Sequence, residues 1–329
     1  MNKKDAAIFY YDADDSYVGS VKSNMHTLMR GTGISFKSYD ADGKQEKQNK
    51  QISKAIKSGI SMIIVNLVDT SDESAMQVVE KAKTADIPVI FFNRPVSQSV
   101  LDSYDKCYLV GTDHELAAHM QGDLIGRYVV ENYKKLDLNG DGVISYCLFK
   151  GQDGNIESEA RTKYAIEDAN AIITAAGHPA LKFYDEKNNK GYLVDRDDAW
   201  SADSAKEYMR EILMTYNEKS GNMVELIIAN NDAMALGAVE SLKDKGYNKI
   251  GKSSIPVFGI DAIKEARESI ADGFMTGTVM QDEKKMSEVI CKIAENLLSK
   301  KAPLDGVDKN MTSGEKRVNI PYSTYFGKS

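Results

Sequence analysis

The sequence predicts an α/β protein made of two similar lobes, each a doubly wound parallel sheet. The chain has 329 residues, which is too long for one ordinary hydrophobic core and suggests two domains. In its first third, short apolar segments alternate with polar segments of helical spacing, a pattern typical of a parallel sheet covered on both faces. The pattern begins again after residues 107–113, so a second unit of similar size follows the first.

The expected elements follow this alternation in order. The spacing of Ile52, Ala55 and Ile56 predicts a helix within residues 47–59, between two apolar strands. Ligands of such sheets bind beyond the carboxyl ends of the strands, so the polar residues that follow each strand matter most for function. The expected strands are AAIFYYD (6–12), ISFKSYDA (34–41), SMIIVNLVD (61–69) and PVIFFNRP (88–95), then SYCLFKG (145–151), ALKFYDE (180–186), VELIIANN (224–231) and SIPVFGID (254–261).

Charge, hydropathy and cysteine usage exclude several classes of protein. The formal net charge of −7 argues against a nucleic-acid partner, which needs a basic face. No apolar run is long enough to span a membrane, and no hydrophobic signal segment precedes the first strand. Cys107, Cys147 and Cys291 are odd in number and lie in apolar surroundings, so we expect buried free thiols.

Residues 137–148 contain half of a calcium-binding loop. A calcium-binding loop has oxygen-bearing side chains at positions 1, 3, 5 and 9, and here these are Asp137, Asn139, Asp141 and Ser145. It also has a glycine at position 6, here Gly142, and a carbonyl ligand at position 7, here that of Val143. Position 12 should be a bidentate glutamate, but it is Leu148, inside a stretch typical of a buried strand. The sequence therefore predicts a calcium site whose missing carboxylate comes from elsewhere in the fold. The alternative is a turn that binds no metal.

Polar and aromatic side chains follow two strands of the first lobe. Asp14, Asp15 and Tyr17 come after AAIFYYD, and Asn93 and Arg94 come after the apolar run PVIFF (88–92). A carboxylate, an amide and an aromatic ring suit a sugar, because polar groups bind its hydroxyls and a ring covers its apolar face. The alternative for Asp14 and Asp15 is that they cap the next helix.

The sequence holds no spacing typical of catalysis. In HELAAH, at 114–119, the second histidine falls at i+5, about 140° away around a helix, so the two histidines cannot share a zinc ion. No P-loop, nucleophile elbow or dinucleotide fingerprint occurs, and the adjacent Asp14 and Asp15 do not suit glycoside hydrolysis. We therefore expect a binding protein rather than an enzyme, with a hydrolase as a distant alternative.

The calcium-type loop running into a strand resembles the periplasmic glucose/galactose-binding protein family. Further segments look like family segments in family order and extend the resemblance over nearly the whole chain: FFNRP (91–95), LDSYDKCYLVGTD (101–113), GDLI (122–125), IIANNDAMALGAVE (227–240) and SSIPVFGIDA (253–262). The resemblance implies a type I periplasmic binding protein, in which a three-segment hinge joins the two lobes. Crossings near Thr112, Gln281 and Asn319 would give an N-terminal sugar-binding lobe of residues 1–111 and 282–318. A C-terminal sugar- and calcium-binding lobe would then comprise residues 112–281 and 319–329.

The same resemblance implies a set of ligand residues. Those that would hold sugar hydroxyls are Asp15, Asn93, Asn155, Glu157, Arg161, Asn231 and Asp261, and those that would cover the two ring faces are Tyr17 and Trp200. Glu225 would supply the bidentate calcium oxygens that Leu148 cannot.

This chain departs from the family pattern at three places. Asn155-Ile156-Glu157 stands where the family has His-x-Asp. Gln281 replaces the usual Asn, and its extra methylene would intrude on the sugar pocket. Ser145 is shorter than the usual Gln, so it would reach calcium through a water molecule.

We therefore expect an extracytoplasmic solute-binding protein, in the periplasm or anchored at the cell surface as a lipoprotein, whose export signal is absent from this sequence. It would be a monomer with a structural calcium ion that captures D-glucose or D-galactose between closing lobes. It would deliver the sugar to an ABC transporter permease and report to a chemoreceptor. The open alternatives are the same fold with a pentose or modified hexose, and the ligand-sensing core of a transcriptional repressor. The repressor needs a helix-turn-helix before the first strand, and residues 1–7 are too short for one.

Overall fold

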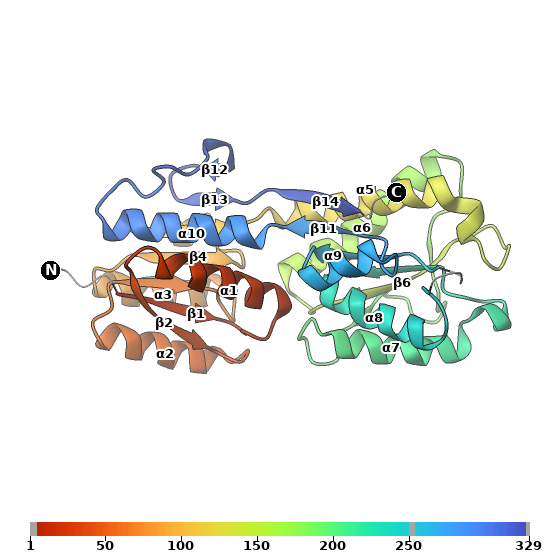
Figure 1. The fold of residues 1–329 in the computed structure, drawn as a ribbon, viewed down its shortest axis with the longest axis horizontal. Helices are drawn as coiled ribbons and strands as arrows, with labels where there is room; N and C mark the ends of the chain where they lie inside the picture. The colour runs from red at the N-terminus through yellow and green to blue at the C-terminus, as the bar shows by residue number, and fades with distance from the viewer. Residues whose placement is uncertain (1–4, 250–253, 327–329) are drawn as a thin grey trace. The chain divides into compact units, whose positions relative to one another are not determined.

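The chain folds into two compact units, as the computed structural model of residues 5–249 and 254–326 shows (Figure 1). Unit 1 comprises residues 1–113 and 282–321, and unit 2 comprises residues 114–281 and 322–329. The chain therefore passes between the units three times. The boundaries lie after residues 113, 281 and 321, where the sequence predicted 111, 281 and 318. Ser253, in one of the family-like segments, lies outside the described residues.

Unit 1 is built on a seven-stranded sheet in the order β12-β13-β5-β4-β3-β1-β2. Its central strands pair in parallel, and only β12 runs antiparallel to its neighbour. The strands are β1 (Asp5–Tyr10), β2 (Ser35–Asp40), β3 (Met62–Val65), β4 (Val89–Asn93), β5 (Cys107–Gly111), β12 (Thr312–Ser313) and β13 (Arg317–Asn319). The helices are α1 (Ser16–Arg30), α2 (Gln45–Lys57), α3 (Asp72–Thr84), α4 (Gln98–Asp102), α10 (Glu283–Leu298) and the 3₁₀ turn η2 (Lys309–Met311).

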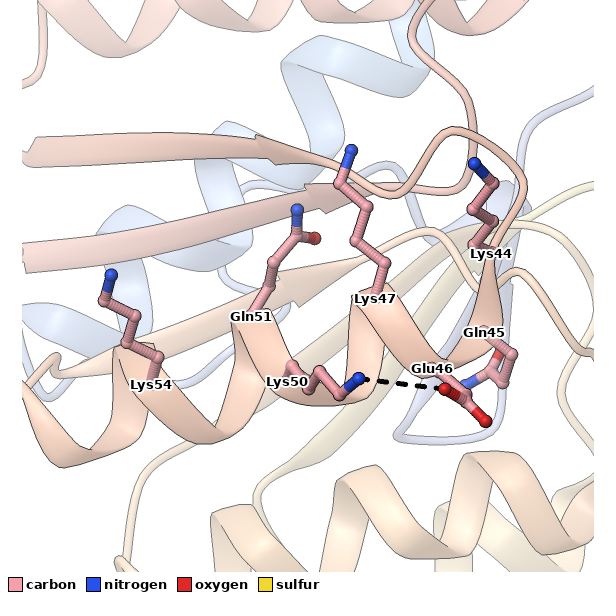
Figure 2. Close-up of a pocket in the computed structure, with 7 residues that line it drawn as sticks. All are labelled: Lys44, Gln45, Glu46, Lys47, Lys50, Gln51 and Lys54. Carbon is pink, nitrogen blue, oxygen red and sulfur yellow. Dashed lines mark ion pairs between the residues drawn. The ribbon is translucent and has the colours of Figure 1, made fainter.

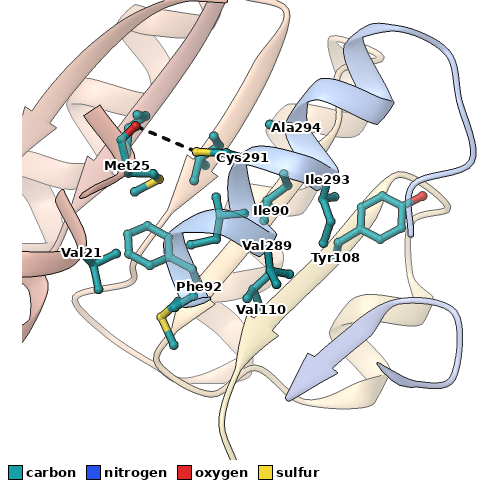
Figure 3. Packing of buried hydrophobic residues seen from close by; sticks show 14 of the residues in the cluster. Val21, Met25, Ile90, Phe92, Tyr108, Val110, Val289, Cys291, Ile293 and Ala294 are labelled. Carbon is teal, nitrogen blue, oxygen red and sulfur yellow. Dashed lines mark hydrogen bonds between the residues drawn. The ribbon is translucent and has the colours of Figure 1, made fainter. Parts of the chain in front are cut away.

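Alternating strand residues divide the core of unit 1 between the two faces of its sheet. Figure 3 shows one face, where Phe92 and Val110 of the strands meet Val289 of α10. On the other face Phe91 and Leu109 pack with the apolar residues of α2 and α3. Both faces of every central strand are therefore buried, which explains why these strands read as continuous apolar runs.

Unit 2 repeats this plan with a sheet in the order β14-β11-β10-β9-β6-β7, and β8 also pairs with β6. The strands are β6 (Ser145–Lys150), β7 (Lys182–Phe183), β8 (Leu193–Val194), β9 (Leu226–Ala229), β10 (Val257–Asp261), β11 (Gly277–Gln281) and the antiparallel β14 (Tyr322–Phe326). The helices are α5 (His114–Leu136), α6 (Ile156–Ala175), α7 (Ala202–Thr215), α8 (Asp232–Asp244), α9 (Lys264–Ala271) and the 3₁₀ turn η1 (Glu218–Ser220). Helices α5 and α6 cover one face of the sheet, and α7, α8 and α9 cover the other.

These observations confirm the predicted fold class of two α/β lobes with parallel sheets. The three cysteines are buried and free, as expected, and burial raises the pKa of the Cys107 and Cys291 thiols to about 12. Within the described ranges, none of the helices has both the length and the apolar character needed to cross a membrane.

Close contact between α5 and α6 depends on Gly122. A Cβ atom at this position would lie 2.7 Å from both the carbonyl oxygen of Tyr164 and the Cβ of Asp168. Gly122 is buried, so the backbone of α6 occupies the space that any side chain would need. The close packing of the two helices therefore requires a glycine here, although glycine is unfavourable in the interior of a helix.

We predict that Gly122→Ala lowers the free energy of unfolding by about 1–3 kcal/mol, because the added methyl group forces the two helices apart. The matched control is Asp123→Ala, one residue further along α5 on its exposed side, which should change stability by less than about 0.5 kcal/mol. Urea denaturation followed by circular dichroism measures both values. Equal midpoints for Gly122→Ala and the wild type would contradict the prediction.

Candidate functional site

The polar residues predicted for unit 1 gather at one edge of its sheet. β1, β3 and β4 are neighbours, so their carboxyl ends place Tyr11, Asn66 and Asn93 side by side. The Asn66 amide donates from Nδ2 to the Asn93 side-chain oxygen at 3.1 Å, and its Oδ1 accepts from the Tyr11 backbone at 3.4 Å. Asn66 is fully buried, so its hydrogen bond holds the Asn93 side chain in place from the interior of the unit.

Asp15 is held at the same edge by two contacts. Its Oδ1 accepts a hydrogen bond from the backbone of Val18 at 2.8 Å, so it caps α1 as the helix-cap interpretation expected. Its Oδ2 accepts from the Tyr11 hydroxyl at 2.7 Å. The Arg94 guanidinium carbon lies 3.5 Å from the centre of the Tyr11 ring and fixes that ring in turn. Capping and a ligand role are compatible, because the carboxylate keeps free lone pairs.

Tyr17 lies two residues beyond Asp15 on α1 and belongs to the core of unit 1. Its side chain is 6% exposed, and its hydroxyl donates to the Met286 sulfur at 3.5 Å. The ring therefore packs against α10, and its role as a sugar-stacking residue stays a prediction.

Unit 2 gathers its predicted ligands around a buried guanidinium. Arg161 is 3% exposed, and its NH1 donates to the Asn230 carbonyl at 2.9 Å, at the carboxyl end of β9. Burial acts to lower the pKa of Arg161, but the charge of Glu157, followed by Tyr322 and Asp261, raises it above its ordinary value. The arginine therefore stays charged among carboxylates, and its Nε has no hydrogen-bond partner among the described residues.

The other predicted residues of unit 2 follow the ends of its strands. Asn155 caps α6 and accepts from the backbone of Glu157 and Ser158, which sets the first turn that carries Glu157. Asn231 caps α8, and its Nδ2 donates to the Trp200 carbonyl at 3.3 Å. Asp261 ends β10 with a φ of 123°, and Gln281 ends β11 with its Nε2 buried and without a partner among the described residues.

Trp200 is buried and stands directly before α7 in a left-handed backbone conformation, with a φ of 56°. A Cβ on Gly151 would lie 2.2 Å from the indole ring, so this glycine is required for the ring to occupy its place. The Arg161 guanidinium carbon lies 5.6 Å from the ring. Trp200 therefore contacts the same cluster as Arg161 and Asn231.

The calcium-type loop lies at the opposite, amino end of β6. The Asp137 carboxylate accepts from the backbones of Gly140 and Gly142, and the side chains of Asn139 and Asp141 accept from the backbones of Asp141 and Val143. Glu225 is fully buried and spans the loop, with Oε1 on the Leu138 backbone at 2.7 Å and Oε2 on the Ser145 backbone at 2.8 Å. The Ser145 hydroxyl donates to Met223 and to Glu225.

These contacts bring Glu225 to the loop from a distant part of the chain, as the half-motif required. Burial raises the pKa of Glu225, and hydrogen bonds from Ser145 and Leu138 oppose this shift. In the parts of the chain that the structure describes, no group of three or more His, Cys, Asp or Glu side chains is arranged to hold a metal ion. The calcium ligands therefore stay a prediction.

A hollow on the surface of unit 1 is lined by other residues. Figure 2 shows its lining of lysine and glutamine side chains on α2, with an ion pair of 3.7 Å between Lys50 and Glu46. The exposed, extended lysines form its walls, which is typical of a solvated helix face. None of the predicted ligand residues lines it.

Comparison with known proteins assigns the class of this protein. The chain matches the family described as periplasmic binding protein domain over residues 6–302, and it belongs to that family of solute-binding proteins. It is 33% identical over 315 residues to the D-galactose/methyl-galactoside binding periplasmic protein MglB of Haemophilus influenzae, with 95% of this chain and 86% of that protein covered. The resemblance inferred from the sequence motifs is thereby confirmed.

Two further relatives support the assignment. The D-xylose-binding periplasmic protein of Escherichia coli is 25% identical over 280 residues, covering 84% of this chain and 72% of that protein. A solved ABC transporter periplasmic solute-binding protein of Actinobacillus succinogenes with bound D-allose has a TM-score of 0.73 at 18% identity. The match covers 98% of this chain and 97% of that one, and it shows the shared fold. These relatives are named as binding proteins, which agrees with the expectation that the chain is not an enzyme.

Sequence reasoning overlooked several residues of the site. Asn66 directly follows β3 (Met62–Val65), and Asn93 is the last residue of the neighbouring β4, so a position at a strand end was the available signal. Lys150 is a charge inside an apolar strand, and the structure buries it with its Nζ 2.7 Å from both Asp153 and Glu159. Asp195, five residues before Trp200, is also buried, and its polar sequence neighbours offered no signal of this.

A buried acid, Asp232, lies next to the site. Asp232 is fully buried, and its carboxylate accepts from the Thr278 hydroxyl at 2.6 Å and the Ile263 backbone at 3.0 Å. Burial raises the pKa of Asp232 to about 7, against the lowering effect of these hydrogen bonds. The folded protein therefore keeps this proton at pH values where the unfolded chain has released it.

We predict that the wild type loses stability relative to Asp232→Asn as the pH rises from about 4 to about 7. In this window the folded state binds more protons than the unfolded state, so the free energy of unfolding falls with pH by at most about 1.4 kcal/mol per unit. Urea unfolding of both proteins across this range measures the difference. A difference that stays constant with pH would contradict the raised pKa of Asp232.

Proposed function

We propose that this protein captures a monosaccharide, D-glucose or D-galactose, with side chains contributed by both units. The observation that carries the proposal is the buried cluster of Arg161 with Glu157, Asp261 and Trp200 at the carboxyl ends of the unit 2 strands. In unit 1, Asn93 is the last residue of β4, and Asp15 lies in the segment between β1 and α1. Strand ends of this kind are where open α/β sheets bind ligands.

The chemistry of the cluster suits a sugar. Each hydroxyl both donates and accepts a hydrogen bond, so a sugar needs carboxylates and amides together with a fixed donor such as guanidinium. An indole ring covers the apolar face that the C–H groups of a sugar present. Because the polar side chains are already held by Asn66, Tyr11 and helix caps, little ordering would be needed on binding.

The proposal includes capture by closure of the two lobes. A sugar that contacts residues of both units in only one arrangement favours that arrangement by the difference in affinity. This supplies a signal that a membrane protein can read. We propose that the protein acts outside the cytoplasm as a monomer, delivers its sugar to an ABC transporter permease and reports to a chemoreceptor.

A different sugar is the second candidate, and specific residues favour it. Asn155, Glu157 and Gln281 depart from the glucose/galactose pattern. At the end of β11, Gln281 adds a buried amide nitrogen, Nε2, that has no hydrogen-bond partner among the described residues. The relatives include proteins named for xylose and bound to allose, so the family fold accommodates other monosaccharides. A pentose or a modified hexose therefore belongs in the same test.

We further propose a structural calcium ion in the loop before β6. The residues that would hold it are Asp137, Asn139, Asp141, the Val143 carbonyl, Ser145 and Glu225. All supply the hard oxygen ligands that calcium requires, and the buried Glu225 carboxylate already faces the loop. Calcium would replace the backbone groups as the partner of this carboxylate and brace the loop at the end of the sheet remote from the sugar residues.

We predict a saturable change in tryptophan fluorescence on titration with glucose or galactose, since Trp200 is the only tryptophan. Arabinose, ribose and xylose form the second arm of the titration. Asp261→Asn should weaken binding of the preferred sugar by about ten- to a hundredfold, because it removes a charged hydrogen-bond acceptor. Isothermal titration calorimetry confirms the affinities without relying on the indole.

Asp272→Asn is the matched control, since it makes the same change on an exposed residue beyond α9 and should leave the affinity unchanged. Binding of a pentose alone would replace the hexose assignment by the second candidate. Absence of heat and fluorescence change with every sugar would overturn the proposed function.

We predict that calcium raises the midpoint of thermal unfolding and that Glu225→Gln largely abolishes the effect. Free calcium at about a hundred times its Kd stabilises a folded protein by about 2.7 kcal/mol, and a neutral amide is a poor bidentate ligand. Glu131→Gln, on the exposed side of α5, is the control and should respond as the wild type does. Identical responses of Glu225→Gln and the wild type would show that Glu225 is not a calcium ligand.

A further inference from the structure

Trp200 occupies a backbone conformation that bulky residues avoid. Its φ is 56°, and Asp198, two residues earlier, also has a positive φ of 54°. Neither is a glycine, so the turn carries local strain that other contacts must offset. Backbone strain of this kind persists only where surrounding contacts hold the residue in place.

The buried carboxylate of Asp195 supplies that restraint. Its Oδ1 accepts from the backbones of Asp197 at 3.0 Å and Ala199 at 3.1 Å. Its Oδ2 accepts from the backbone of Ser201 at 2.8 Å and from the Ser201 hydroxyl at 2.9 Å. Four hydrogen bonds to one carboxylate thus close the turn on both sides of Trp200. Charged acceptors of this kind form the stronger hydrogen bonds of proteins.

Asp195 is itself tied to the strand end that supports the indole ring. Its backbone nitrogen donates to the Lys150 carbonyl at 2.8 Å, and Gly151, the next residue, lies against the Trp200 ring. The turn that carries Trp200 and the surface that its ring contacts are therefore both attached to the carboxyl end of β6. Asp195 is 4% exposed, so solvent does not compete for these bonds.

We propose that Asp195 is the positioning residue that presents the Trp200 ring to the ligand. The carboxylate holds residues 197–201 in the strained turn before sugar arrives, so the ring is already in place and binding does not have to order it. This inference rests on the proposed function for its consequence in affinity. The positioning itself is a property of the free protein and can be measured without any sugar.

A helix-capping role is the alternative that the test must separate. Asp195 also contacts Ser201, the N-cap of α7, whose hydroxyl oxygen accepts from the Ser204 backbone at 3.2 Å. A residue that served only the cap would affect the stability of the protein and leave the surroundings of the indole unchanged. The emission of Trp200 distinguishes these roles.

The first experiment uses ligand-free Asp195→Ala and Asp195→Asn, with Asp197→Ala as the control. Asp197 is exposed and lies two residues away, so its loss makes the same change of charge in the same turn. In the wild type Trp200 is only 7% exposed. For Asp195→Ala we therefore expect a red shift of the emission maximum and stronger acrylamide quenching, because the released ring gains contact with solvent. Asp195→Asn retains one acceptor oxygen and should show a smaller change in the same direction, and Asp197→Ala should match the wild type.

The second experiment is a double-mutant cycle read by calorimetry with the sugar that the wild type binds. Asp195→Ala should weaken binding by about tenfold, the cost of ordering a side chain and its turn. In the Trp200→Ala background, the same change should have no further effect on affinity, because Asp195 acts through the ring.

The outcomes are distinct. Unchanged emission and quenching in both Asp195 variants, with folding verified by circular dichroism, would overturn the positioning role. An equal loss of affinity with and without Trp200 would also overturn it, since Asp195 would then act by another route. If the wild type binds no sugar, the proposed function fails, and the ligand-free fluorescence still decides whether Asp195 positions Trp200.

Discussion

The buried guanidinium of Arg161 is the constraint around which unit 2 is organised. A charge that is removed from water must be paired and hydrogen-bonded, or the fold loses more than it gains. Here the Asn230 carbonyl accepts one bond, and Glu157, Tyr322 and Asp261 keep the group charged. The charge of Arg161 also acts on Asp232 and lowers its pKa, but burial of this carboxyl raises the pKa by more. Unit 1 likewise places a buried guanidinium, that of Arg94, at its polar edge, where it lies over the Tyr11 ring.

Several candidate ligands have a backbone conformation that non-glycine residues rarely adopt. Asn93, Trp200 and Asp261 all have positive φ values, although none is a glycine. Each stands at or near the carboxyl end of a strand or at the start of a helix, where a side chain must turn sharply toward the edge of its sheet. Strain of this kind costs of order 1–3 kcal/mol per residue and persists only if neighbouring contacts outweigh it. The buried Asn66 and Asp195 supply such contacts in the two units.

The calcium-type loop uses the other end of the same strand. β6 begins at Ser145, next to Glu225, and ends at Lys150, next to Gly151 and the Trp200 ring. A single buried strand thus connects the loop to the surface that supports the indole. The oxygen-rich loop and the mixed polar and aromatic groups of the candidate site therefore lie at opposite ends of β6.

The alternation of continuous apolar strands with helices is enough to predict the fold class, because such strands can bury both faces only in parallel sheets. The same pattern places the candidate residues at strand ends, and the structure brings the Glu225 carboxylate to the backbone of the half-motif at 137–148. Three features become visible only in three dimensions: Tyr17 packs in the core of unit 1, Asn66 fixes Asn93, and Asp195 closes the turn around Trp200. The reason is physical: periodicity records which face of an element is buried, whereas a contact such as Asp195 with Ser201 depends on a turn whose conformation no local pattern encodes.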